Sequence, residues 1–231
     1  MLQHIGIVCC SAEGAALCYR TLCLEGQALL GPYRHPEIST HTPPLSRYMT
    51  FIEREDWDGV GEVMLDSAER LALAGADFLI CPDNTMHQAL GRIARNLPLP
   101  WLHIAEAVAD EAVRRGFRHL GLTGTRWLMA SEVYPAILDR RGLSWLLPTD
   151  TEREGINRII LEELTYGVCK PEAVAYFQQV IGRMQDAGAD AVVLGCTEIP
   201  LLMNDGNSPL PTLDSTRLLA RAALHRAIGA A

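Results

Sequence analysis

Short apolar runs alternate with longer amphipathic stretches along the chain. Ile5–Val8, Phe78–Cys81 and Ala191–Leu194 are apolar segments of the length typical of strands buried on both faces of a parallel sheet. Between such segments apolar residues recur at helical spacing, as in Val60–Ala74 and Tyr176–Ala187. Strands that alternate with helices predict an α/β fold, in which helices cover both faces of parallel sheets.

The same pattern predicts the remaining elements. A helical stretch leads from Gly14 towards Cys23. The proline-rich segment Gly31–Ser46 is predicted to be a loop around at most one short strand, Glu37–Thr40. Further predicted segments are helix His87–Asn96, a short apolar piece at Trp101–Ile104, helix Ala105–Arg115, strand His119–Leu122 and the C-terminal helix Ser215–Ile228.

A set of short motifs occurs twice and divides the chain into two halves. The pairs are Gly75–Asp77 with Gly188–Asp190 (Gly-Ala-Asp), His4–Ile7 with His119–Leu122 (His-x-Gly) and Pro98–Pro100 with Pro209–Pro211 (Pro-Leu-Pro). Strand, glycine and helix recur in all α/β proteins, but three matching motifs at nearly the same spacing favour a true repeat. We therefore predict two pseudo-symmetric parallel-sheet α/β lobes with the active site in the interlobe cleft.

Two polar residues occupy equivalent strand ends in this repeat. Superposing the Gly-Ala-Asp triplets places Asp83 on Cys196, and open α/β sheets bind ligands beyond the carboxyl ends of their strands. Backbone NH groups in the turn around Cys196 would lower the pKa of its thiol from about 8.5 and favour the thiolate. We expect Cys196 to be the reactive thiol and interpret Cys18, Cys23 and Cys169 as ordinary small apolar residues.

Two interpretations of Asp83 are open at this stage. Asp83, Asn84 and Thr85 are residue types that cap helices, and a capping turn can also bind an anion. As a catalytic group, Asp83 would need a pKa above its reference value of about 3.9, which burial in a closed cleft would provide. His87 and His103, which follow, are interpreted as hydrogen-bonded polar groups rather than bases.

Other polar residues extend the candidate site. Thr125 closes the first strand of the second half, and Cys10 with Ser11 closes the first strand of the first half. The hydroxyl groups of Thr125 and Ser11 are suited to binding a carboxylate. Arg47 and Lys170 are cations that could pair with an acidic substrate, although lone charges of this kind are more often solvated surface groups.

Composition argues against several classes of protein, among them nucleic-acid-binding and membrane proteins. The net charge of −8 argues against nucleic-acid and anionic-membrane partners, and the 48% of hydrophobic residues suffices for a buried core. No membrane-spanning segment or secretory signal is recognisable, so we expect a cytoplasmic protein. The seven cysteines do not indicate a disulfide framework or a zinc site, and no glycine-rich dinucleotide fingerprint follows the first strand. We expect no metal and no cofactor.

Four stretches of the chain resemble the aspartate/glutamate racemase family. They are Asp83–His87, Gly124–Met129, Gly195–Pro200 and Asp214–Thr216. The resemblance spans nearly the whole chain in order, and its Gly-Cys-Thr-Glu element is fairly specific. It implies two pseudo-symmetric α/β lobes that the chain connects around residues 100 and 210, which gives one lobe of residues 1–100 plus 210–231 and another of residues 101–209. It also implies no cofactor such as PLP, frequent assembly as a homodimer, and an active site in the interlobe cleft.

The resemblance also implies roles for individual residues. In the family two cysteines flank the α-carbon of the substrate; Cys196 matches the second, whereas Asp83 replaces the first. The N-terminal glycine-rich loop of the family is altered here to Cys9-Cys10-Ser11. The expected substrate contacts are Asn84, Thr85, Thr125 and Thr197, completed by Glu198.

Three functions follow as hypotheses. The first is a PLP-independent racemase or epimerase for aspartate, glutamate or a related polar amino acid, with Cys196 and Asp83 as its two bases. The second is a single-thiol decarboxylase or isomerase of the same fold, in which Asp83 only positions the substrate. The third is a non-catalytic protein that binds a small carboxylate, although a pure binding protein has no need of an activated thiol.

Overall fold

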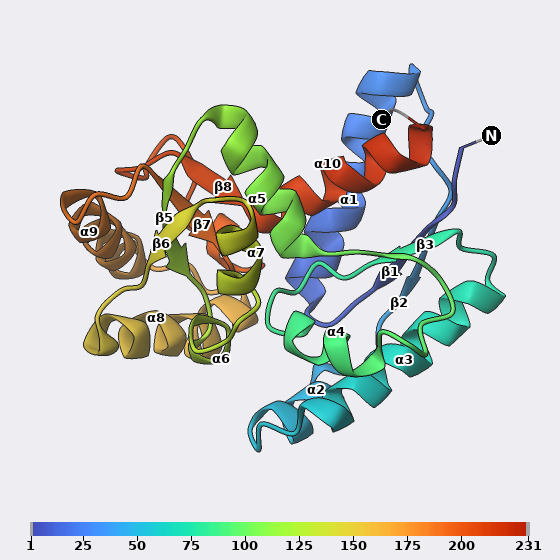
Figure 1. Ribbon diagram of the computed structural model, residues 1–231, viewed down its shortest axis with the longest axis horizontal. Coiled ribbons are helices and arrows are strands. Elements are labelled where there is room, and N and C mark those ends of the chain that lie inside the picture. Colours follow the sequence, from blue (N-terminus) through green and yellow to red (C-terminus); the bar gives the residue numbers. More distant parts are fainter. Residues whose placement is uncertain (1, 230–231) are drawn as a thin grey trace. The chain divides into compact units, whose positions relative to one another are not determined.

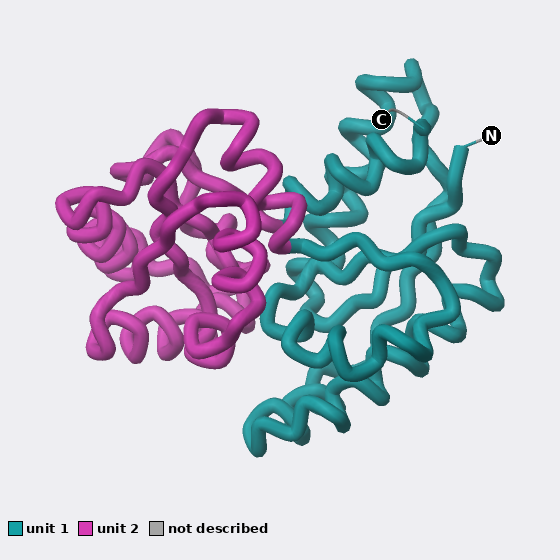
Figure 2. The backbone as a smooth tube through the Cα atoms, in the orientation of Figure 1, with its two compact units in different colours: residues 1–104, 216–231 teal, residues 105–215 magenta. Residues whose placement is uncertain are grey.

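The computed structural model describes residues 2–229 and contains two parallel four-stranded sheets flanked by helices (Figure 1). The predicted α/β class is confirmed. The chain divides into two compact units, shown in different colours in Figure 2. Unit 1 comprises the chain up to Ile104 together with the segment from Thr216 onwards, and unit 2 comprises Ala105–Ser215.

Unit 1 contains a sheet with the strand order β2-β1-β3-β4. Its strands are β1 (Ile5–Val8), β2 (Ile38–His41), β3 (Phe78–Ile80) and β4 (Trp101–Leu102). Its helices are α1 (Ala12–Leu30), α2 (Leu45–Ile52), α3 (Trp57–Leu73), α4 (His87–Ile93) and α10 (Ser215–Ile228). Residues of β1 and β3 pack against α1 and α10 in one apolar cluster, and α3 contacts β1 and β2.

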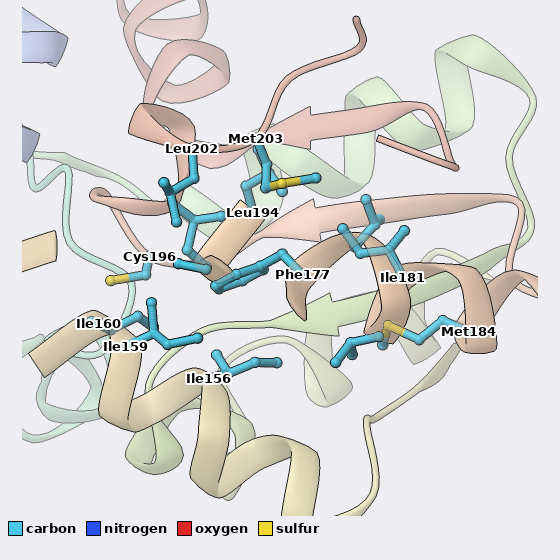
Figure 3. Packing of buried hydrophobic residues seen from close by; sticks show 14 of the residues in the cluster. Ile156, Ile159, Ile160, Phe177, Ile181, Met184, Leu194, Cys196, Leu202 and Met203 are labelled. Carbon is cyan, nitrogen blue, oxygen red and sulfur yellow. The ribbon is translucent and has the colours of Figure 1, made fainter. Parts of the chain in front are cut away.

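Unit 2 contains a sheet with the strand order β6-β5-β7-β8. Its strands are β5 (His119–Thr123), β6 (Ser144–Leu146), β7 (Ala191–Leu194) and β8 (Thr212–Asp214). Its helices are α5 (Ile104–Arg115), α6 (Arg126–Met129), α7 (Pro135–Arg140), α8 (Asp150–Glu162) and α9 (Pro171–Asp186), with short 3₁₀ turns η1 (Leu164–Tyr166) and η2 (Ile199–Leu201). Side chains of α8, α9 and β7 form its main apolar core (Figure 3).

The two sheets share one topology and one register. Ile5 of β1 pairs with Phe78 of β3, and Leu120 of β5 pairs with Ala191 of β7. The fourth strands pair equivalently: Leu79 of β3 pairs with Trp101 of β4, and Val192 of β7 pairs with Thr212 of β8. The ladders therefore preserve the sequence repeat position by position.

The repeated Gly-Ala-Asp triplet has a structural cause. Gly75 and Gly188 have φ angles of +91° and +99°, in the left-handed region where glycine is favoured, and they end α3 and α9. The carboxylate of Asp77 then accepts a hydrogen bond from His4 N at 2.6 Å, and that of Asp190 accepts one from Arg118 N at 2.6 Å. Each triplet stops a helix and fastens the start of the first strand of its sheet.

Several elements lie outside the sequence-based prediction. Helix α2 begins at Leu45, at the end of the predicted proline-rich loop, and β6, α6, α7 and α8 were not predicted. Helix α8 has a recognisable start signal, a capping box in which the Thr149 hydroxyl accepts from Glu152 N and the Glu152 carboxylate accepts from Thr149 N. Among the described helices, none has the length and apolar character needed to cross a membrane.

Candidate active site

Asp83 and Cys196 occupy equivalent places in the two sheets. Asp83 follows Phe78, the partner of Ile5, by the same number of positions as Cys196 follows Ala191, the partner of Leu120. Each residue lies just beyond the carboxyl end of the third strand of its unit, β3 or β7, where parallel sheets place ligand-binding groups. The equivalence that the motifs predict is thus reproduced by the ladders of both units.

Cys196 lies at one end of the unit 2 core. Its side chain is buried, and its Sγ points away from Phe177 and the rest of the labelled cluster (Figure 3). The thiol donates a hydrogen bond to Glu198 Oε2 at 2.9 Å, and the Thr197 hydroxyl donates to the same oxygen at 2.8 Å. A nucleophile, a hydroxyl and a carboxylate are therefore joined directly within one buried turn.

Gly195 lets the chain pass close to the neighbouring strand just before Cys196. Its NH donates to Thr123 O at 3.0 Å, and a Cβ at this position would lie 2.4 Å from that same backbone oxygen. The obstacle is main chain rather than a flexible side chain, so it cannot move aside. Only glycine fits here without displacing β5 or the Cys196 turn.

Replacing Gly195 with alanine is expected to lower the free energy of unfolding by about 1–3 kcal/mol, the usual cost of overpacking, and to reduce activity by displacing Cys196. Urea denaturation measures the first effect. Gly182→Ala is the control, because Gly182 lies in α9 and a Cβ there would have no neighbour within 4 Å. An unchanged free energy of unfolding in Gly195→Ala would contradict this account of the turn.

The Asp83 turn has the geometry of a helix cap. Asp83 Oδ1 accepts a hydrogen bond from Met86 N at 3.3 Å, and Asn84 O accepts one from His87 N at 3.2 Å as α4 begins. Asn84 and Thr85 are buried in the same turn. Asp83 thus caps the turn that leads into α4, whose own N-cap, Met86, has no side-chain hydrogen bond. The catalytic role of Asp83 stays a prediction.

His87 fastens this turn to the end of the sheet. Its Nδ1 lies 2.8 Å from Asp83 O, and its Nε2 accepts from Ile104 N at 3.3 Å and from Trp101 Nε1 at 3.4 Å. Burial, and to a lesser degree the neighbouring His103, hold the pKa of His87 well below its usual value. His87 is thus a neutral, fully bonded group that positions Asp83, as the sequence indicates, and not a base.

Two buried thiols of unit 1, Cys9 and Cys81, are unlike an activated nucleophile. Burial raises the pKa of Cys81 well above its ordinary value, and the nearby charge of Asp83 raises it further. Burial likewise raises the pKa of Cys9. Both groups therefore stay protonated at neutral pH and are poor nucleophiles. Cys10, also buried, lies between Cys9 and Ser11 at the end of β1.

Ser11 and Thr125 cap corresponding helices in the two units. Ser11 Oγ accepts a hydrogen bond from Gly14 N at the start of α1, and Thr125 Oγ1 accepts one from Leu128 N at the start of α6, each at 3.2 Å. Both residues are buried and follow the first strand of their sheet. The structure therefore gives each hydroxyl a capping role beside the predicted one in substrate binding.

Arg47 and Lys170 each pair with a carboxylate of their own unit. Arg47 Nη1 lies 3.5 Å from Asp66 Oδ2, and Lys170 Nζ lies 3.2 Å from Glu163 Oε1. Both cationic side chains are 53% exposed. Of the two interpretations left open by the sequence, these ion pairs favour the solvated surface charge.

Tyr48 of α2 is a candidate that sequence reasoning missed. Its side chain is fully buried, and its hydroxyl has no hydrogen-bond partner among the residues described. Burial raises the pKa of Tyr48, and negative charge on Cys81, Cys10 and Asp83 would raise it further. A phenolic hydrogen-bond donor therefore lies near the end of the strand that precedes Asp83. From helical periodicity alone, Tyr48 would be predicted only to be a core residue.

Within residues 2–229, no three His, Cys, Asp or Glu side chains form an arrangement that could hold a metal ion. The candidate site itself presents a thiol, carboxylates and hydroxyl groups. These groups transfer protons and bind polar substrates.

Comparison with known proteins adds independent information. The family model described as Asp/Glu/hydantoin racemase matches residues 7–223. The broad-specificity amino-acid racemase RacX of Bacillus subtilis strain 168 is 25% identical over 170 residues, which cover 72% of each chain.

Two solved structures resemble the whole chain. One, described as a candidate Asp/Glu racemase from Yersinia pestis, has a TM-score of 0.88 at 29% identity and covers 98% of this chain and 100% of its own. The other, an aspartate racemase homologue from Pyrococcus horikoshii OT3, has a TM-score of 0.84 at 28% identity with the same coverage. Sequence motifs, repeated topology and these comparisons agree: the chain belongs to the Asp/Glu/hydantoin racemase family, a family of isomerases.

Proposed function

We propose that the protein is a cofactor-independent racemase or epimerase for aspartate, glutamate or a related polar amino acid. The observation that carries this proposal is the equivalence of Asp83 and Cys196 at matching strand ends of two sheets with one topology. A homodimer and a cytoplasmic location, both expected from the sequence, belong to the same proposal.

Racemisation without a cofactor needs two groups on opposite faces of the α-carbon. One removes the α-proton, and the other delivers a proton to the far face of the planar intermediate. In the proposed mechanism Cys196 and Asp83 fill these roles and exchange them when the opposite enantiomer reacts. Two chemically different bases predict different kcat and KM values for the two directions, while kcat/KM must be equal because enantiomers have equal free energy.

Hydrogen-bond donors must stabilise the intermediate, because the α-proton of an amino acid is very weakly acidic. Each preorganised donor to a developing oxyanion is worth roughly 3–4 kcal/mol. The proposed substrate contacts are Asn84, Thr85, Thr125 and Thr197, which are buried and follow the ends of β3, β5 and β7. The Tyr48 hydroxyl is a further donor near the Asp83 end.

The runner-up is a single-thiol decarboxylase or isomerase. It is favoured by one observation, the hydrogen bond from Met86 N to Asp83 Oδ1, which gives Asp83 a structural task. Incubation with single enantiomers of aspartate and glutamate in D₂O, followed by proton NMR and chiral chromatography, separates the candidates. A racemase exchanges the α-proton and inverts the centre, a decarboxylase releases CO₂, and a binding protein does neither.

Independence from cofactors gives a further prediction. Racemisation is expected to persist, within about twofold, after exhaustive dialysis against EDTA and in the presence of hydroxylamine, which traps carbonyl cofactors, because the proposed chemistry uses only protein side chains. A coupled chiral assay with and without each reagent measures this. Loss of activity that returns on adding a metal ion or a carbonyl cofactor would overturn the proposed mechanism.

A further inference from the structure

We propose that Glu198 is a positioning residue that keeps Cys196 protonated at rest and makes its thiolate a stronger base during turnover. This inference deepens the proposed function and rests on the assignment of Cys196 as one of the two bases. It gives Glu198 a role different from the direct substrate contact that the sequence suggests.

Glu198 is aimed at the thiol and held there. Its Oε2 accepts hydrogen bonds from Cys196 Sγ at 2.9 Å and from Thr197 Oγ1 at 2.8 Å. The exposed fractions of Cys196, Thr197 and Glu198 are 7%, 2% and 3%. Because both donors converge on one buried oxygen, the carboxylate orientation is fixed by the turn itself and needs no substrate.

The charge of this partner sets the preferred state of the thiol. A carboxylate that accepts the S–H bond stabilises the neutral thiol, and it repels the thiolate that forms when the proton leaves. This effect opposes the backbone NH groups that led us to expect a thiolate, and burial strengthens it by excluding water. In the hydrogen bond between them the thiol is the donor and the carboxylate the acceptor, so the shared proton lies on sulfur.

The effect on turnover follows from the proton balance. When Cys196 is the acid, its S–H bond breaks, a Cα–H bond forms and the electron pair stays on sulfur, while Asp83 retains the former α-proton. When Cys196 is the base, its thiolate takes the α-proton, the Cα–H pair stays on the substrate, and the new S–H donates to Glu198. Once the thiolate has formed, Glu198 therefore makes it the stronger base, because it stabilises the thiol that results. The same stabilisation lowers the fraction of the protein that carries the thiolate at rest.

A substrate ligand would behave differently. A fixed carboxylate repels the carboxylates of an acidic amino acid, so Glu198 could contact such a substrate only through its ammonium group. In that case Glu198→Gln would raise KM and leave the ionisation of Cys196 in the free protein unchanged. A purely structural role would lower stability and also leave that ionisation unchanged.

The test is titration of Cys196 in the free protein. Thiolate absorbance near 240 nm is followed against pH in the wild type and in Glu198→Gln, each corrected with the same background carrying Cys196→Ser. The rate of iodoacetamide labelling at Cys196 is read by mass spectrometry, with exposed Cys169 as internal standard. We expect the midpoint to fall by about one pH unit, and labelling at neutral pH to become roughly tenfold faster.

Two variants control for charge and folding. Glu162→Gln removes the same charge from an exposed position of α8 and should leave the midpoint unchanged, whereas Glu198→Asp should give an intermediate value. Equal midpoints in the wild type, Glu198→Gln and Glu198→Asp would overturn the proposal. The titration uses no substrate, so a shifted midpoint in a protein that fails to racemise amino acids would refute the proposed function and leave this coupling standing.

Discussion

Cys196→Ala is expected to abolish racemisation of either enantiomer, with a loss of at least 10²–10⁴-fold, the range contributed by a positioned acid–base group. The turn after β7 presents one thiol, and its Sγ points away from the apolar core (Figure 3). The cost in stability should be small, because the Cβ that packs at the end of the core is kept. Circular dichroism of the reaction mixture follows racemisation continuously.

Cys169→Ala is the matched control for this variant. Cys169 is exposed and belongs to the same unit, so its loss should leave both activity and stability unchanged. Wild-type racemisation in a well-folded Cys196→Ala protein would remove the proposed mechanism, since no other thiol could take the same place in unit 2.

Asp83→Asn is expected to stop racemisation, again by 10²–10⁴-fold, while α-proton exchange of one enantiomer with D₂O continues through Cys196. Asparagine caps helices as well as aspartate does, so the hydrogen bond from Met86 N should persist and the turn should stay folded. The substitution therefore removes the carboxylate and little else. Proton NMR in D₂O measures exchange, and chiral chromatography measures inversion.

Asp56→Asn supplies the matched control. Asp56 caps α3 of the same unit by accepting from Gly59 N at 3.0 Å, so the same substitution tests the cap without touching the candidate site. We expect wild-type activity there. Wild-type racemisation in Asp83→Asn would make Asp83 a helix cap and substrate ligand only, and the second proton would then come from Cys10, Ser11 or a bound water.

The backbone of this protein is largely readable from its sequence because the signals are local and repeated. Strands β1 and β7 and helix α10 have the predicted bounds, since each is a continuous apolar run or a periodic stretch with clear ends. The repeat was detectable because the Gly-Ala-Asp triplet performs one task twice, ending a helix and fastening a strand. Ending the helix requires a glycine, and holding the strand requires an aspartate, so both functions are visible in the sequence as one motif.

Side-chain direction could not be read in the same way. The Gly-Cys-Thr-Glu motif marked the Cys196 turn, but no periodicity reveals that the Glu198 carboxylate turns back onto the thiol. Tyr48 lies in a short helix and looks like any core aromatic until its unpaired hydroxyl is seen. The ion pairs of Arg47 and Lys170 could not be predicted either, because no sequence motif links these cations to their carboxylate partners.

The most direct test of the central claim compares both single variants with both enantiomers in D₂O. If Asp83 and Cys196 act on opposite faces of the α-carbon, each variant keeps one base and so exchanges the α-proton of one enantiomer. We predict that Asp83→Asn and Cys196→Ala exchange opposite enantiomers, while the wild type exchanges and inverts both. Exchange of the same enantiomer by both variants, or of both enantiomers by either, would contradict the two-base account.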